Sequence, residues 1–173
     1  NSGAEANECA IKIARKYGEK RGAYKIATLE NSFHGRTLTT LAATGQECFH
    51  KDFLPLTEGF LYAKAGDIKA MDALLEGSVC AVMIETVQGE GGVVPMDPDF
   101  LKALRALCDK RDVLLVIDEV QTGVGRTGHF YSYQGYGVQP DVVTSAKGLG
   151  GGLPIGICLV TEKLRDILKP GQQ

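Results

Sequence analysis

The sequence lacks the features that mark several large classes of protein. It contains no tryptophan, only 7% aromatic residues and a formal net charge of −2, and no basic run is interleaved with aromatics. Such a chain creates no overall field that attracts nucleic acid or an anionic membrane. The longest apolar run, at 79–84, is far shorter than the roughly 18 residues of a membrane span, and no signal peptide is visible. We therefore expect a cytoplasmic protein with no nucleic-acid partner and no membrane.

Paired cysteines and metal-ligand patterns are also missing. The five cysteines are dispersed, with no Cys-x-x-Cys pair: Cys9, Cys48, Cys80, Cys108 and Cys158. This set is typical of reduced thiols rather than a disulfide framework or a zinc site. The three histidines, His34, His50 and His129, have no partner four residues away and no Cys or Asp ligand pattern, so we expect no metal site.

The length of 173 residues suffices for one domain with its own core. The chain begins at Asn1, without methionine and directly on an expected helix start, and it stops at Gln173 just after an expected helix. We therefore expect it to be part of a larger protein.

Apolar periodicity predicts strands alternating with helices. The expected strands are 25–29, 79–84, 113–117, 142–143 and 155–160, and the expected helices are 4–17, 37–44, 67–75, 97–110 and 161–168. Residues 45–66 show no period and are expected to be irregular. Strands that are apolar throughout and alternate with helices predict an α/β fold, with a mostly parallel sheet covered by helices on both faces. No internal repeat or domain boundary is visible.

The most informative stretch runs from 113 to 147. A buried-strand pattern ends there in Asp118 and Glu119, and Lys147 follows the next apolar run with a glycine-rich segment behind it. The carboxyl ends of parallel strands meet at the sheet edge where open α/β sheets bind ligands. A lysine at that edge is a candidate for Schiff-base chemistry.

A P-loop ATPase is one interpretation of this stretch, because an apolar strand ending in Asp118 and Glu119 fits a magnesium-binding strand. Such an enzyme needs the motif Gly-x-x-x-x-Gly-Lys-Ser/Thr. The nearest match, 123–128, is followed by His129 and lacks the lysine. The interpretation is weakened but stays open, since the motif could lie outside this chain.

A pyridoxal 5′-phosphate site is the second interpretation. This cofactor needs a lysine for its Schiff base, an acid near its pyridine nitrogen and a phosphate cup. Asp118 would keep the nitrogen protonated, and Lys147, once released, would move the substrate proton. Gly3 and Ala4 begin a helix, whose N-terminal N–H groups favour phosphate, and Phe33 could stack on the ring.

Five segments carry a resemblance to a known family: 1–7, 33–37, 87–92, 118–123 and 146–152. In this order they resemble the class III (subgroup II) pyridoxal-phosphate-dependent aminotransferases, and the likeness covers nearly the whole chain. It implies that residues 1–173 are a partial large domain of the type I aminotransferase fold, without the N-terminal segment and the small domain. Intact members of that family are homodimers with sites at the subunit interface.

The resemblance also implies roles for individual residues. The catalytic pair would be Lys147, which forms the Schiff base, and Asp118. The cofactor would be bound by Gly3 and Ala4 at its phosphate, Phe33 at its ring face, Asp118 at its pyridine nitrogen, Gln121 at its phenolic oxygen and Lys147 at its aldehyde carbon.

The substrate would meet two further residues. Arg36 would bind its carboxylate, and Glu90 would be the switch acid that pairs with an arginine outside this chain. Glu85 would support the site from behind, and Glu119 would be structural. Thr86 departs from the family, which usually carries proline there.

Within the family the chain looks most like enzymes that transfer the terminal amino group of N-acetylornithine to 2-oxoglutarate in arginine biosynthesis. His34 favours this substrate over ornithine, because ornithine aminotransferases tend to carry tryptophan at its position. Succinylornithine and succinyldiaminopimelate remain open, since this segment hardly contacts the acyl group. A hypothesis from another class is an inactive truncated fragment without cofactor, which predicts exposed apolar surface.

Overall fold

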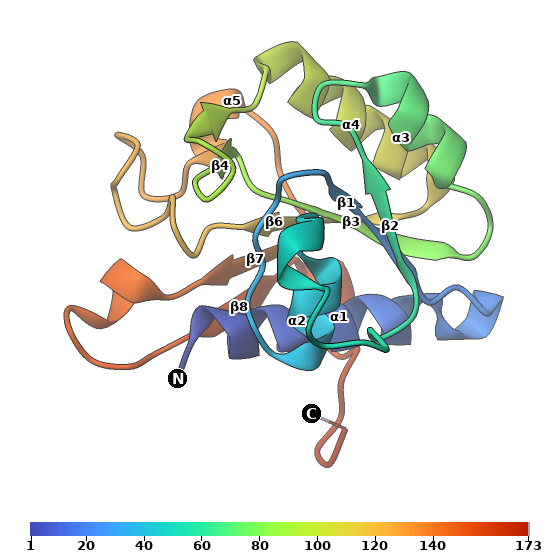
Figure 1. The fold of residues 1–173 in the computed structure, drawn as a ribbon, viewed down its shortest axis with the longest axis horizontal. Helices are drawn as coiled ribbons and strands as arrows, with labels where there is room; N and C mark the ends of the chain where they lie inside the picture. Colours follow the sequence, from blue (N-terminus) through green and yellow to red (C-terminus); the bar gives the residue numbers. More distant parts are fainter. Residues whose placement is uncertain (173) are drawn as a thin grey trace.

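A computed structural model describes residues 1–172 as three layers, with a central sheet between two layers of helices (Figure 1). The sheet has six strands in the order β2-β1-β3-β6-β7-β8. In this spatial order the strands are β2 (Phe60–Ala63), β1 (Lys25–Leu29), β3 (Val79–Ile84), β6 (Leu114–Asp118), β7 (Val142–Ser145) and β8 (Ile157–Val160). Five strands are parallel, and β8 runs antiparallel to β7. The predicted mostly parallel α/β sheet is therefore confirmed.

Helices cover both faces of this sheet (Figure 1). One layer holds α1 (Gly3–Gly18) and α2 (Leu38–Ala43), and the other holds α3 (Ile68–Leu74) and α4 (Pro98–Arg111). The remaining elements are short: α5 (Tyr133–Tyr136), the hairpin strands β4 (Val87–Gln88) and β5 (Val94–Pro95), and the 3-10 turns η1 (Glu19–Arg21), η2 (Glu47–Phe49), η3 (Lys147–Gly150) and η4 (Glu162–Leu164).

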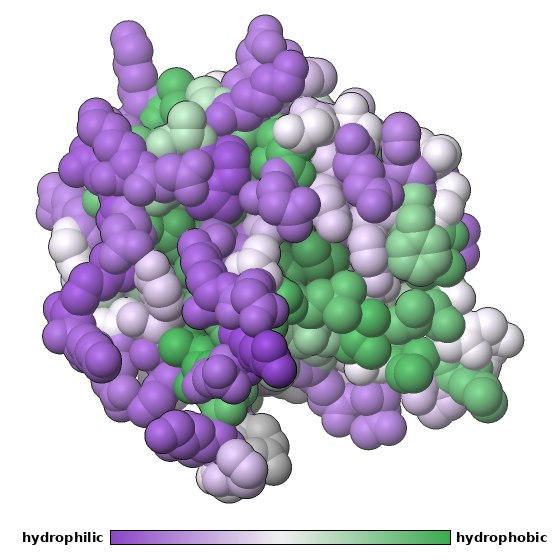
Figure 2. Space-filling view, turned by 180° about the vertical axis from the view of Figure 1, so that it is seen from behind, coloured by the Kyte–Doolittle hydropathy of each residue, from purple (hydrophilic) through white to green (hydrophobic). Residues whose placement is uncertain are grey.

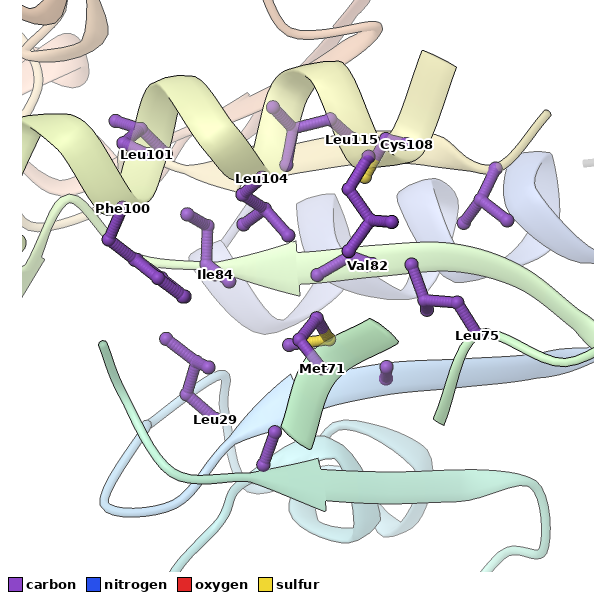
Figure 3. Close-up of a cluster of buried hydrophobic side chains, with 14 of the residues drawn as sticks. Leu29, Met71, Leu75, Val82, Ile84, Phe100, Leu101, Leu104, Cys108 and Leu115 are labelled. Atoms are coloured by element: carbon purple, nitrogen blue, oxygen red, sulfur yellow. The ribbon is translucent and has the colours of Figure 1, made fainter. Parts of the chain in front are cut away.

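The larger core lies between the sheet and the α3–α4 layer. Figure 3 shows Leu104 and Cys108 of α4 above Val82 and Ile84 of β3, with Met71 of α3 beside them. All five side chains are fully buried or nearly so. Because both faces of β3 are covered, every one of its residues is buried, which explains why its sequence is apolar without alternation.

A second core lies between the sheet and α1. Ala10, Ile11 and Ala14 of the helix pack against Met83 and Val116 of the sheet. The alanines let the helix approach the strands closely. Ser2 begins α1 as its N-cap, and its hydroxyl oxygen accepts a hydrogen bond from the N–H of Glu5 at 3.2 Å. This packing fixes the N-terminus of α1 at the edge of the sheet where the candidate site lies.

Two of the local predictions are wrong. Residues 45–66 are not wholly irregular, because β2 forms an edge strand at Phe60–Ala63. The stretch 161–168 does not form the expected helix and contains only the 3-10 turn Glu162–Leu164. Its apolar residues Leu164, Ile167 and Leu168 still pack against the α1 core, so their spacing reflects burial rather than helical structure. Among residues 1–172, no helix combines the length and apolar character that crossing a membrane requires.

Apolar side chains also reach the surface, as the face opposite to that of Figure 1 shows (Figure 2). Near β8 the exposed ones are Leu153, Ile155, Leu159 and Val160. The inactive-fragment hypothesis predicts such exposure. A cofactor-binding domain that packs against further protein shows it as well, so this surface does not separate the two hypotheses.

Candidate active site

One cleft collects all the predicted site residues. It lies at the carboxyl ends of the parallel strands, where β1, β3, β6 and β7 end near the start of α1. The eight predicted residues that line it are Gly3, Ala4, Phe33, Arg36, Glu90, Asp118, Gln121 and Lys147. These residues are spread over most of the chain, and the parallel topology brings their strand ends together. Their roles toward a cofactor and a substrate stay predictions.

Asp118 is the last residue of β6 and lies at the floor of the cleft, only 4% exposed. Its Oδ2 accepts a hydrogen bond from the side-chain amide of Asn7 at 2.7 Å and another from Nδ1 of His34 at 2.9 Å. Its Oδ1 accepts bonds from the N–H of Val120 at 3.0 Å and from the hydroxyl of Thr144 at 3.4 Å. Four donors that converge on two oxygens hold a carboxylate in one orientation.

His34 and Glu85 lie behind this carboxylate and share its field. Burial lowers the pKa of His34, but the hydrogen bond and charge of Asp118, with the charge of Glu85, outweigh that cost and raise it overall. Burial raises the pKa of Glu85 to about 7, against the opposing charge of His34. Glu85 also accepts a hydrogen bond from the N–H of Phe33 at 3.0 Å. Two buried titratable groups therefore lie beside Asp118.

The start of α1 supplies unpaired backbone donors to the cleft. The N–H of Glu5 is bonded to the hydroxyl of Ser2, and the N–H of Ala6 to the carbonyl of Ser2. Gly3 and Ala4 precede the first intrahelical donors, and their N–H groups have no hydrogen bond within the described part of the chain. Two such groups at the positive end of a 16-residue helix favour an anion.

Phe33 and Arg36 follow β1 on the opposite wall. The half-buried ring of Phe33 lines the cleft, and the guanidinium carbon of Arg36 lies 5.8 Å from its centroid. A second ring, Phe49 of η2, lies 5.3 Å from the same guanidinium carbon. The guanidinium of Arg36 therefore lies at the cleft against two aromatic rings, Phe33 and Phe49.

Lys147 begins η3 directly after β7, and its side chain is exposed to the cleft. Its backbone φ is 45°, in the left-handed region that costs a residue with a side chain roughly 1–2 kcal/mol. Strained backbone of this kind is held by its surroundings and is common at functional sites.

Gln121 and Glu90 complete the lining from two loops. The side chain of Gln121 packs directly against Gly89, the residue before Glu90. A Cβ at Gly89 would lie 1.4 Å from the side-chain oxygen of Gln121, so only glycine allows this contact. Glu119 faces away from the cleft lining and ties the following loop together, accepting bonds from the hydroxyl of Thr122 at 2.5 Å and from the N–H of Tyr133 at 2.9 Å. A structural role for Glu119 stays a prediction.

Sequence reasoning missed the three side chains that donate to Asp118, which are Asn7, His34 and Thr144. The sequence gives no sign that His34 contacts Asp118, and Asn7 stands in it only as part of the first helix motif. Asn7 is buried in the middle of an apolar helix face at 1% exposure, and a buried amide needs a partner. That rule could have marked Asn7 as a site residue, although it could not have named Asp118, which lies 111 residues away.

Comparison with known proteins confirms the resemblance. The family model described as aminotransferase class-III matches residues 1–173. An acetylornithine aminotransferase of Caldanaerobacter subterraneus is 54% identical over 99% of this chain and 44% of its own length. A succinylornithine transaminase of Salmonella paratyphi B is 52% identical over 99% of this chain and 43% of its own. The chain thus spans less than half the length of these curated relatives.

The solved structures agree with the fold. The ornithine aminotransferase of Toxoplasma gondii, described with partial occupancy of PLP at its active site, superposes with a TM-score of 0.94. It is 36% identical, over 100% of this chain and 43% of its own. Pyridoxal 5′-phosphate is the cofactor of this group of enzymes. From its first residue to its last, the chain belongs to the class-III aminotransferase family.

Proposed function

We propose that this chain is the cofactor-binding part of an enzyme that transfers the terminal amino group of N-acetylornithine to 2-oxoglutarate, as in arginine biosynthesis. The observation that carries the proposal is the meeting of Asp118, Lys147 and the free N–H groups of α1 in one cleft. The family supports amino-group transfer, and the names of the relatives support an ornithine derivative as substrate.

The residues present fit pyridoxal 5′-phosphate. The unpaired N–H groups of Gly3 and Ala4 offer donors to a phosphate, and the half-buried Phe33 offers an aromatic face. The carboxylate of Asp118 lies on the same cleft as an acceptor for a protonated ring nitrogen, and Lys147 offers an exposed amine. When bound, the cofactor supplies an electron sink for the negative charge that develops at the substrate carbon.

The chain's own residues would do the remaining work. Asn7 and His34 hold Asp118 in place, so that its charge favours the protonated state of the nitrogen it faces. Nζ of Lys147 would be the base that takes the proton from the carbon bearing the amino group. Arg36 would orient the substrate through its carboxylate, and Glu90 would pair with an arginine outside this chain.

The acyl group on the substrate is the least constrained part of the proposal. The relatives named for acetylornithine and for succinylornithine are nearly equal in identity, at 54% and 52%. Succinylornithine is therefore the second candidate. Relative kcat/KM values for N-acetylornithine, N-succinylornithine and ornithine, measured with the full-length enzyme, will decide between them.

We further propose that residues 1–173 are a partial large domain of a cytoplasmic homodimer. The share of each relative's length that the chain covers supports a larger whole. Exposed apolar side chains near β8 supply surface that can pack against the rest of the protein.

Covalent labelling tests the proposal and the role of Lys147. Borohydride reduction in the presence of pyridoxal 5′-phosphate, followed by peptide mapping, is expected to find a pyridoxyl group on Lys147. Lys147→Ala should abolish this adduct and keep the circular dichroism of the folded chain. Lys102→Ala, at an exposed lysine of α4, is the matched control and should keep the adduct.

The experiment should be run on the 173-residue chain and on the full-length protein. Labelling in the full-length protein alone would mean that further residues complete the phosphate site. A folded full-length protein that gains no adduct at Lys147 would refute the proposal and favour the inactive alternative.

A further inference from the structure

We propose that Phe49, which no motif of the family resemblance includes, is a positioning residue that holds Arg36 for the carboxylate of the substrate. This inference rests on the proposed function and deepens it, because it names a residue that sets the preference for substrates with an α-carboxylate. Phe49 is the last residue of η2 and lies outside the set of residues that line the cleft.

The contacts around Arg36 form a compact support. Its guanidinium carbon lies 5.3 Å from the ring centroid of Phe49 and 5.8 Å from that of Phe33. The two rings meet edge to face, with centroids 6.0 Å apart and an interplanar angle of 76°. A guanidinium is attracted to aromatic faces, and its flat shape lets it stack on them.

Arg36 is otherwise free to bind an anion. Within residues 1–172 its side chain has no hydrogen bond and no ion pair, although it lines the cleft. Its N–H donors therefore remain available for a bidentate contact with a carboxylate. An exposed arginine without support would lose much rotamer freedom on binding. The two rings limit that freedom beforehand, which favours binding.

Phe49 can provide this support because its own segment is anchored. The Nε2–H of the next residue, His50, donates to the carbonyls of Thr44 at 2.7 Å and Leu41 at 3.0 Å, at the C-terminal end of α2. The hydroxyl of Tyr62 in β2 donates to the carbonyl of Ala42 at 2.5 Å. These contacts tie η2, α2 and the edge strand together, so the ring of Phe49 is held by more than its contact with Arg36.

The test compares two substrates that differ only in the α-carboxylate. These are N-acetylornithine and N-acetyl-1,4-diaminobutane, assayed with the full-length enzyme loaded with cofactor. Phe49→Leu is expected to raise KM for N-acetylornithine roughly fivefold, with kcat within about twofold of wild type. Activity toward the amine without a carboxylate should stay unchanged. Phe49→Tyr, which keeps the aromatic face, should behave like wild type.

The control is Phe53→Leu, at a ring on the same segment that is 56% exposed. It should leave both substrates unaffected. An unchanged KM in Phe49→Leu would overturn the proposal. Equal loss with both substrates would also overturn it, because Phe49 would then act through Phe33 or the fold rather than through Arg36.

A binding measurement separates this inference from the proposed function. Calorimetric titration of the cofactor-free protein with N-acetylornithine should show the same roughly fivefold weakening in Phe49→Leu. If Phe49→Leu binds N-acetylornithine more weakly than the wild type, but the wild type transfers no amino group, the proposed function fails and the role of Phe49 stands. If the wild type transfers the amino group but Phe49→Leu binds N-acetylornithine as tightly as the wild type, the role of Phe49 fails and the proposed function stands.

Discussion

At the scale of single residues, the site combines the buried acids Asp118 and Glu85 with exposed charged residues such as Lys147. Asp118 is held by donors on both oxygens, whereas Glu85 is 5% exposed, and its burial outweighs the charge of His34 and the backbone hydrogen bonds that lower its pKa. Burial of an acid with few partners favours its protonated form. Burial therefore shifts the ionisation of Glu85 toward neutral pH, with a pKa of about 7.

The burial of Glu85 predicts that the free energy of unfolding depends on pH, and that Glu85→Gln removes this dependence. Burial raises the pKa of Glu85 from 4.5 to about 7, so the folded state binds a proton that the unfolded state releases. The resulting stabilisation is complete below pH 4.5 and is lost as the pH rises through about 7, at a cost of up to about 3 kcal/mol. Glu85→Gln should thus raise the free energy of unfolding relative to wild type at about pH 8, with little difference near pH 4.5.

Urea titrations of the cofactor-free chain at the two pH values measure this difference. Glu76→Gln, at an exposed glutamate in the turn after α3, is the control and should show no such dependence. A Glu85→Gln variant that differs from wild type by the same amount at both pH values would contradict the assignment.

The sequence was sufficient to predict that residues at strand ends and at a helix start meet in one cleft, while their roles stay predictions. Lys147, Asp118 and Gly3 are examples, because motif and topology together determine which edge they reach. It was not sufficient for Asn7 and His34, whose importance comes from contacts with a residue 111 and 84 positions away. The same limit applies to Phe49, since no local pattern shows that a ring in an irregular segment lies against Arg36.

At the scale of elements, the site depends on how closely α1 approaches the loop after β6. Gly3 makes this approach possible, because a Cβ there would lie 2.5 Å from one methyl of Val120 and 2.9 Å from the other. The branched side chain of Val120 has little freedom to move aside. The contact sets the position of the helix end that is expected to bind phosphate.

Gly3→Ala is therefore expected to destabilise the chain by about 1–3 kcal/mol through overpacking and to weaken the binding of pyridoxal 5′-phosphate. Val120→Ala in the same chain should recover most of this loss, because it removes both crowded methyl groups. Chemical unfolding and cofactor titration of the two single variants and the double variant measure the coupling.

Gly77→Ala is the matched control, since a Cβ at that position meets nothing within 4 Å. It should change stability by less than about 0.5 kcal/mol. Additive effects of Gly3→Ala and Val120→Ala would show that the two residues do not meet as described.

The elements themselves were predicted well where periodicity was long, as in α1 and α4, or where a strand was apolar throughout, as in β3. The edge strand β2 was missed because only Ala63 of its four residues is buried and the strand lies between irregular segments. The stretch 161–168 was expected to be helical because Leu164, Ile167 and Leu168 are spaced like a helix face, yet a 3-10 turn places the same side chains on the core.

At the scale of the whole molecule, the sheet ends in two very different edges. The hydroxyl of Tyr62 bonds β2 to the end of α2, which partly covers that edge. β8 pairs only with β7, and no other strand among residues 1–172 pairs with it. Its side chains Leu159 and Val160 are 42% and 38% exposed. An apolar edge strand with unpaired backbone groups is a template for pairing with another chain.

The isolated 173-residue chain should therefore self-associate through β8. Leu159→Lys is expected to lower light scattering several-fold at tens of micromolar protein, because a lysine on an edge strand opposes edge-to-edge pairing. Leu54→Lys, at a loop residue that is 70% exposed, removes more exposed apolar surface than Leu159→Lys without touching a strand edge, and should still have a smaller effect. Unfolding in urea should be nearly unchanged in both variants, because neither side chain is buried. If the two substitutions lower scattering equally, exposed apolar surface in general drives the association, and pairing at the β8 edge does not. If only Leu159→Lys lowers it, β8 is the surface that the rest of the protein must cover.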